Sequence, residues 1–291
     1  MFNRFRLRSG KNGDTDQRGR TDLKALTVKQ VPGANDWNDD GVVLLPNFMP
    51  EDLLRKYEQC WLASNGSGTV DDFEVVRPMG WDYCTPYREH TEILDLLTWG
   101  PLQEQMQTLV GEPVGTHLNL TGWKTTTRAW HQDSYLNPVH VGDYYIAAWI
   151  ALETVNPDSG PFQYVPGSHR WPQVTQEKIM NALKPEERNH SWPTASERIL
   201  TPLFTKEIER RGATVRSYLP NRGDVLLWHG RLLHQGSMAK DPTLLRRSLI
   251  AHFSGINHRS DMPPAEQYGQ GWYFPVDDGS RTIQSPQKDI S

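Results

Sequence analysis

The sequence is poor in cysteine and has no long apolar run. Only two of its 291 residues, Cys60 and Cys84, are cysteine, and their spacing fits neither a disulfide framework nor a zinc knuckle. No apolar segment approaches the roughly 18 residues that a membrane-spanning helix needs. These absences argue against a disulfide-stabilised secreted scaffold and an integral membrane protein. They predict a soluble protein of the reducing cytoplasm, with no membrane partner.

The chain also lacks the positive charge of a nucleic-acid-binding protein. Its formal net charge is −4, although the first 30 residues hold eight Lys and Arg against three Asp and Glu. The remaining body is therefore more acidic than the total, which argues against nucleic acid as a partner. Residues 1–30 contain no apolar signal segment, and we predict a solvated, poorly ordered arm rather than a targeting or polyanion-binding tail.

Aromatic residues and chain breakers are abundant. Eleven Trp, ten Tyr and eight Phe, together with 21 Pro and 23 Gly, predict short strands and turns around an aromatic-rich core, in one domain over residues 31–291. The polar segment 170–214 is expected to be a lid. Strand patterns cover residues 41–46, 73–76, 114–120, 144–152, 161–165, 214–219, 224–229 and 246–253. Helical patterns cover 50–62, 91–110 with a break at Gly100-Pro101, 175–183 and 205–211, and the chain after Gly255 is expected to be loop.

The tetrapeptide Trp130-His131-Gln132-Asp133 places an imidazole and a carboxylate two residues apart. On a strand, this spacing would point both side chains to the same face. One further histidine would complete the 2-His-1-carboxylate set that leaves coordination positions open on Fe(II). The segment 223–237 offers His229 and His234 as candidates for that third ligand.

Once the segment 223–237 is included, the motifs of the sequence resemble those of the phytanoyl-CoA dioxygenase (PhyH) family of Fe(II)- and 2-oxoglutarate-dependent oxygenases, over roughly residues 38–255. The resemblance implies a mainly β fold, a double-stranded β-helix or jelly-roll, cupin-like barrel with buttressing α-helices. It assigns the iron to His131, Asp133 and His234. From its position we expect His229 to be a core or supporting residue, with the role of ligand in place of His234 as its alternative, and we expect His169 to cap or pack the Pro-Gly-Ser-His turn. The matching motifs are residues 41–46, 130–133, 148–152, 161–169 and 223–237 and Arg246-Arg247; His234-Gln235-Gly236-Ser237 stands where the family usually has His-Gly-Ser.

The resemblance also assigns residues to the co-substrate 2-oxoglutarate. It places Arg246 on the distal carboxylate, with Lys124 and Ser237 as further contacts. A guanidinium pairs with a carboxylate through two parallel hydrogen bonds, which supports an arginine in this role. The pattern alone leaves Arg247 as an alternative. On an ideal strand Arg246 shares its face with Ser248, Ile250 and His252, whereas Arg247 shares its face with Leu249, Ala251 and Phe253.

The predicted function is an Fe(II)- and 2-oxoglutarate-dependent dioxygenase. It is expected to hydroxylate a small organic metabolite with O2 and to release succinate and CO2. In related halogenases a small residue replaces the carboxylate ligand, so Asp133 favours hydroxylation or a related oxidation. Two rivals differ in class: a non-catalytic jelly-roll ligand-binding protein, and a jelly-roll metalloenzyme that does not use 2-oxoglutarate. Aromatic residues near the motifs, Trp228 among them, line either a pocket or the core.

Overall fold

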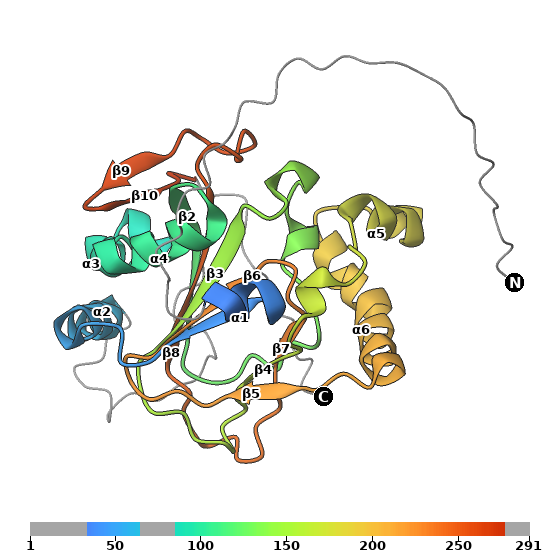
Figure 1. Ribbon diagram of the computed structural model, residues 1–291, viewed down its shortest axis with the longest axis horizontal. Coiled ribbons are helices and arrows are strands. Elements are labelled where there is room, and N and C mark those ends of the chain that lie inside the picture. Colours follow the sequence, from blue (N-terminus) through green and yellow to red (C-terminus); the bar gives the residue numbers. More distant parts are fainter. Residues whose placement is uncertain (1–33, 65–84, 277–291) are drawn as a thin grey trace, which may run out of the picture.

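The computed structural model describes residues 34–64 and 85–276. Within them, two β-sheets are flanked by helices on both sides (Figure 1). Two sequence-based predictions lie outside the described residues: the basic arm at residues 1–30 and the strand at residues 73–76. None of the described helices is long and apolar enough to cross a membrane.

The larger sheet has seven strands in the order β1-β6-β3-β8-β2-β10-β9. Its first five strands are antiparallel neighbours, and β10 joins β2 in parallel. The smaller sheet has the order β5-β4-β7. The strands are β1 Val42–Leu45, β2 Val114–Gly122, β3 Tyr145–Ala151, β4 Phe162–Tyr164, β5 Arg216–Tyr218, β6 Val225–His229, β7 His234–Gly236, β8 Ser248–Gly255, β9 Glu266–Tyr268 and β10 Gly271–Tyr273.

Side-chain alternation divides the larger sheet into an inner and an outer face. On β3, Ala148 and Ile150 pack outward in the core beneath the helices. Ala147 and Trp149 pack inward, together with Phe162 of the smaller sheet. Both faces of β3 are buried, which explains its unbroken apolar sequence. The facing sheets form the jelly-roll barrel, so the predicted fold class is confirmed.

Three helices cover the outer face of the larger sheet (Figure 1). α2 Glu51–Ser64 matches the predicted helix, with Glu51 and Asp52 in its first turn. The second predicted helix is two helices, α3 Thr91–Leu97 and α4 Gly100–Val110, because Pro101 is accepted in the first turn of a new helix. α1 Ala34–Asp39 precedes β1.

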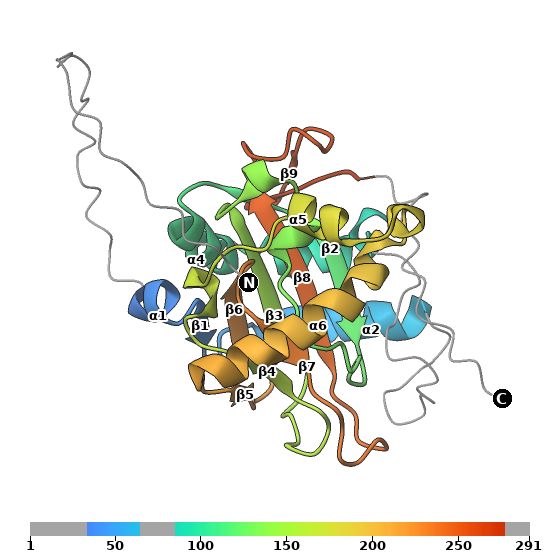
Figure 2. The ribbon, with the colours of Figure 1, turned by 90° about the vertical axis from the view of Figure 1, so that its right-hand side faces the viewer.

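The segment 170–214 lies on the opposite side of the molecule, where α6 crosses in front of the sheets (Figure 2). It contains α5 Gln176–Ala182 and α6 Trp192–Arg211. The predicted helical piece at 205–211 was too short, since α6 begins 13 residues earlier and continues through Pro202. Prolines at 193 and 202 read as helix breaks in the sequence, but the first occupies the initial turn and packing carries the helix past the second.

The chain after Gly255 is only partly loop, which corrects the prediction. β9 and β10 form an antiparallel hairpin there, and Trp272 of β10 pairs with Gly115 of β2. Both strands have only three residues; β9 is mostly exposed, and β10 has one buried glycine and two half-buried aromatic residues, so neither shows an apolar alternation that the sequence could reveal.

Short 3-10 helices complete the chain. They are Pro86–Arg88, Ser134–Leu136, Val139–Val141, Ser168–Arg170 and Pro185–Glu187.

A charged cluster connects α2 to the end of the larger sheet. Arg222, in the turn before β6, donates to both carboxylate oxygens of Glu58 at 2.8 and 2.9 Å and to the Leu152 carbonyl. It also pairs with Glu51. Arg247 adds a second contact to Glu58 at 3.2 Å. Glu58 is only 9% exposed, so these arginines offset the cost of burying its carboxylate.

We expect Arg222→Ala to lower the free energy of unfolding by about 2–4 kcal/mol, because it leaves a buried carboxylate with one partner fewer. Arg55→Ala is the matched control, since Arg55 pairs with Glu51 on the surface with 70% of its side chain exposed. The control should cost less than about 1 kcal/mol. Urea denaturation of both variants measures the difference, and equal costs would contradict the role given to the cluster.

Candidate metal centre

His131 and His234 are held side by side by their backbones. Each donates its N–H to the other's carbonyl at 3.0 Å, in an isolated antiparallel bridge. Asp133 then turns away, and its N–H and that of Ser134 both bond to the Gly230 carbonyl. The His131-x-Asp133 pair therefore lies on a bridge and the following turn rather than on a strand, which corrects the expected geometry. Gly230 is required because a Cβ there would lie 2.6 Å from the Tyr145 ring.

Three side chains converge at this point, all buried: His131, Asp133 and His234. One ligand atom from each lies within 4.8 Å of the other two. The His131 Nε2 is 3.8 Å from one Asp133 oxygen, and the His234 Nε2 is 3.7 Å from the other. Both distances are too long for hydrogen bonds, so the three groups do not satisfy one another.

The backbone sets which nitrogen of each imidazole faces the carboxylate. The His131 Nδ1 lies 2.7 Å from the Ala129 carbonyl, and the His234 Nδ1 lies 3.0 Å from the Leu232 carbonyl. Because a carbonyl only accepts, both Nδ1 atoms carry the hydrogen. The Nε2 lone pairs therefore face Asp133, which is the arrangement of metal-binding histidines with fixed tautomers.

Burial and neighbouring charges give these groups the protonation states that a cation needs. Burial lowers the pKa of His131 well below its usual value, and it lowers the pKa of His234 as well. Burial alone would raise the pKa of Asp133, but His234, His252 and Arg128 outweigh it and lower that pKa. Two neutral imidazoles and one carboxylate result at neutral pH, and this donor set suits a divalent transition metal.

Two residues that the sequence did not assign to the centre adjoin Asp133. Trp228 Nε1 donates to Asp133 Oδ2 at 3.0 Å. His252 Nδ1 lies 3.9 Å from the same oxygen and forms a hydrogen bond of 2.5 Å with the Tyr145 hydroxyl. His252 lies on β8, in the same alternation as Arg246 two residues before that strand, so strand alternation was the signal that could have found it.

Arg246 lies inside the barrel and Arg247 outside. Arg246 is 3% exposed, and one of its terminal nitrogens donates to the Gly160 carbonyl at 2.6 Å. Its Nε has no hydrogen-bond partner, and burial lowers its pKa to about 10. Arg247 instead pairs with Glu153 at 2.7 Å and with Glu58. Of the two arginines, Arg246 is the one whose guanidinium could bind an anion within the barrel.

Lys124 and Ser237 lie near the Arg246 end of the barrel. Ser237 donates its hydroxyl to the Pro161 carbonyl at 2.7 Å, next to Gly160. Gly160 has φ +80°, and a Cβ there would meet the Ser237 carbonyl oxygen at 2.6 Å, so this turn needs glycine. Lys124 is half-buried and directly follows Trp123, whose carbonyl accepts the Arg246 N–H.

His229 and His169 lie apart from the three converging side chains. The His229 Nδ1 accepts the Arg231 N–H at 3.0 Å, and its Nε2 lies 3.5 Å from Asp143. The His169 Nε2 lies 3.2 Å from the Asn38 carbonyl. The two rings are neighbours at 5.3 Å, near Trp37 and α1.

Comparison with known proteins gives one matching family model and one group of curated relatives. The model, described as phytanoyl-CoA dioxygenase (PhyH), matches residues 87–241. The peroxisomal phytanoyl-CoA dioxygenase of Homo sapiens is 24% identical over 201 residues, which are 68% of this chain and 52% of that protein. This chain thus spans about half the length of the curated relative it matches.

Solved structures share the fold at low identity. EctD from S. alaskensis, crystallised with 2-oxoglutarate and 5-hydroxyectoine, has a TM-score of 0.56 and 16% identity, covering 82% of this chain and 81% of that one. The epimerase SnoN, solved with Fe3+, alpha ketoglutarate and nogalamycin RO, has a TM-score of 0.55 and 16% identity, covering 83% and 96%. At these identities the likeness establishes the architecture.

We expect Trp228→Phe to weaken binding of a divalent metal by about 10- to 100-fold, because Asp133 loses the donor that orients it. Trp149→Phe is the control, since the Trp149 indole is buried in the same interior cluster but its Nε1 has no hydrogen-bond partner. Titration with Mn(II) or Co(II) measures both affinities. Equal affinities in the two variants would show that the indole N–H does not support the centre.

Proposed function

The chain belongs to the phytanoyl-CoA dioxygenase (PhyH) family, and from this premise we propose that it is an Fe(II)- and 2-oxoglutarate-dependent dioxygenase. We propose further that it hydroxylates a small organic metabolite and releases succinate and CO2. One observation carries the proposal: the buried, carboxylate-free guanidinium of Arg246 lies inside the same barrel as the group His131, Asp133 and His234.

The donor set fits ferrous iron. Two imidazoles and one carboxylate converge, and in the 2-His-1-carboxylate arrangement the remaining positions stay open for a co-substrate and O2. His131 and His234 would bind through Nε2, and Asp133 through a carboxylate oxygen. Trp228 holds the other oxygen of Asp133, so the carboxylate keeps one orientation. SnoN, with the same architecture, is described with Fe3+.

The surroundings of Arg246 fit a dicarboxylate. A buried guanidinium without a counter-charge is costly, and among the described residues the Arg246 side chain donates to the Gly160 carbonyl and contacts no carboxylate. A carboxylate would accept a hydrogen bond from the unpaired Nε and neutralise the positive charge of Arg246 through charge-assisted hydrogen bonds. EctD is described with bound 2-oxoglutarate, which supports this assignment. Lys124 and Ser237 are proposed as further contacts to the same molecule.

The residues of this chain would hold the metal, orient the co-substrate and enclose the site. When bound, Fe(II) and 2-oxoglutarate supply the O2 chemistry that yields succinate and CO2. Arg246 would hold the carboxylate at the far end of the co-substrate, and His131, Asp133 and His234 would hold the metal that binds its other end. Trp228, Tyr145 and Phe162 enclose the centre in a buried aromatic cluster that limits water.

Half-buried apolar side chains mark the proposed place of the substrate. Leu118, Leu120 and Ile250 share the inner face of β2 and β8, since Leu118 pairs with His252 and Leu120 with Ile250. They remain partly exposed, whereas the outward Leu249 is fully buried. This part of the interior is therefore open, and an apolar portion of a small metabolite would pack there.

We propose the segment 170–214 as the lid over this interior. Its apolar residues Ile179, Leu200 and Phe204 pack on Tyr135 and Leu233, which flank the metal centre in sequence. α6 also contributes Glu197, which pairs with Arg128 at 3.2 Å. Arg128 precedes His131 by three residues, so the lid is connected directly to the loop that carries two ligands.

Hydroxylation is proposed because Asp133 is present as a third protein ligand. A site that keeps its carboxylate has no vacated ligand position for a halide. The neighbour SnoN is described as an epimerase, so the fold supports several oxidative outcomes, and product analysis with a substrate distinguishes them.

We expect Arg246→Gln to weaken 2-oxoglutarate binding at least about 30-fold, because a buried charged partner is lost. Arg247→Gln is the matched control. It removes the neighbouring arginine, which pairs outside the barrel, and should leave this affinity unchanged. Anaerobic titration of the Fe(II)-loaded protein, followed by the visible charge-transfer absorption of the chelate, measures both. Unchanged binding in the Arg246 variant would favour a metalloenzyme that does not use 2-oxoglutarate.

We expect the wild-type protein to convert 2-oxoglutarate to succinate in the presence of Fe(II) and O2, and His131→Ala to lose this activity by at least about 100-fold. His229→Ala is the control, since His229 is buried but lies outside the converging group. Succinate is quantified by mass spectrometry. A folded wild-type protein that shows neither the anaerobic absorption nor succinate would favour the non-catalytic binding protein.

A further inference from the structure

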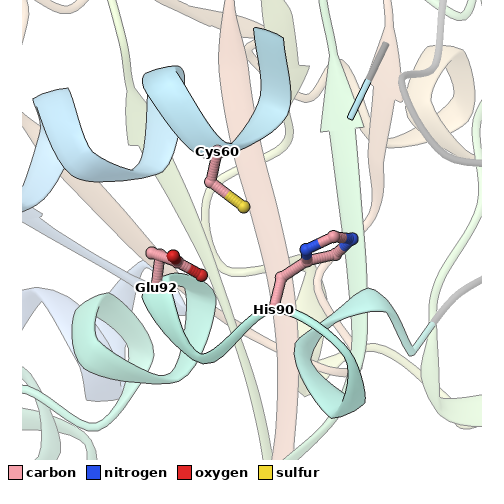
Figure 3. A group of neighbouring side chains, drawn as sticks. All are labelled: Cys60, His90 and Glu92. Atoms are coloured by element: carbon pink, nitrogen blue, oxygen red, sulfur yellow. The ribbon is translucent and has the colours of Figure 1, made fainter. Parts of the chain in front are cut away.

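A second group of metal-ligating side chains lies outside the barrel, between α2 and α3. Figure 3 shows Cys60 projecting from α2 toward His90 and Glu92, which stand at the start of α3. One ligand atom from each residue lies within 4.8 Å of the other two. Cys60 is a free cysteine, and both it and His90 are half-buried. We propose that Cys60, His90 and Glu92 form a zinc-binding site.

The donor types select the metal. A thiolate, an imidazole and a carboxylate are the three side-chain ligands that zinc takes in proteins. Calcium and magnesium prefer oxygen ligands alone, so the sulfur argues against them. Three protein ligands complete a tetrahedral zinc with one water, since zinc is four-coordinate in most sites.

The geometry allows closure around an ion. Zinc–ligand bonds of about 2.0–2.3 Å place neighbouring ligand atoms of a tetrahedral site roughly 3.5 Å apart. The three atoms here are at most 4.8 Å apart, so about 1 Å of movement brings them together. Because the side chains reach the surface, rotation about their side-chain bonds supplies this movement without disturbing the core.

Electrostatics favour a cation at this point. Burial and the nearby Glu92 raise the pKa of the Cys60 thiol to about 11. A divalent cation between the two residues would neutralise the carboxylate and stabilise the thiolate. Binding would then exchange the thiol proton for the metal.

The fold gives this site a structural effect. α2 and α3 pack against each other and on the outer face of the larger sheet. His90 is the residue immediately before α3 and Glu92 is in its first turn, so an ion bound to Cys60 would fix the start of α3 against α2. The site lies on the helix side of the sheet, whereas His131, Asp133 and His234 lie on the inner side.

Cobalt(II) tests the proposal in the full-length protein, because a thiolate ligand gives a near-ultraviolet charge-transfer band that imidazole and carboxylate ligands do not. We expect this band in the wild type and in Cys84→Ser, the control that removes the other cysteine. It should persist in His131→Ala, which separates this site from the barrel centre. It should be lost in Cys60→Ser.

Two further measurements keep the test decisive if one variant is unstable. Glu92→Gln should weaken Co(II) binding by more than the roughly 10- to 100-fold that loss of an outer-shell partner costs. With the inner centre removed by His131→Ala, zinc should raise the melting temperature, whereas it should not do so in the double variant His131→Ala/Cys60→Ser, whose fold is checked by circular dichroism. No band in the wild type, or a band that survives Cys60→Ser, would overturn the site.

Discussion

The constraint on which the barrel interior depends is an unpaired buried charge. Arg246 is 3% exposed and donates to a backbone carbonyl rather than to a carboxylate. A fold tolerates this only where other interactions offset the cost or where a ligand supplies the missing charge. The Gly160 turn, with its left-handed backbone and its carbonyl aimed at Arg246, belongs to the same arrangement. The large and small sheets therefore meet around a position that the proposed anion would complete.

Strand alternation explains why the adjacent residues Arg246 and Arg247 contact different groups on opposite faces of the sheet. Arg246 is in phase with Ser248, Ile250 and His252 on the inner face of β8, where His252 approaches Asp133. Arg247 is in phase with Leu249, which packs beneath the helices. There Arg247 stabilises α2 through Glu58 and lies over the Trp123 ring. A shift of one residue in register would exchange these roles and leave both sets of partners unsatisfied.

Much of this arrangement could be predicted from the sequence, because apolar runs such as 144–152 and the helix pattern of 50–62 report burial directly. The bridge carrying His131 could not, since it is a single backbone pairing with His234, about one hundred residues away. The roles of Trp228 and His252 were hidden for a related reason: both contact Asp133 across the barrel. The hairpin β9–β10 was missed because its two three-residue strands are too short to show an apolar alternation.

The larger sheet also separates two sets of ligand types. Two imidazoles and a carboxylate lie on its inner side, and a thiol, an imidazole and a carboxylate lie on its outer side. Zinc binds nitrogen and oxygen donors more tightly than Fe(II) does, so the inner centre cannot choose iron by affinity alone. A thiolate on the outer side adds a ligand that suits zinc better. With both proposed sites present, zinc would fill the outer site first and the inner centre would keep its open positions for iron as long as free zinc stays scarce.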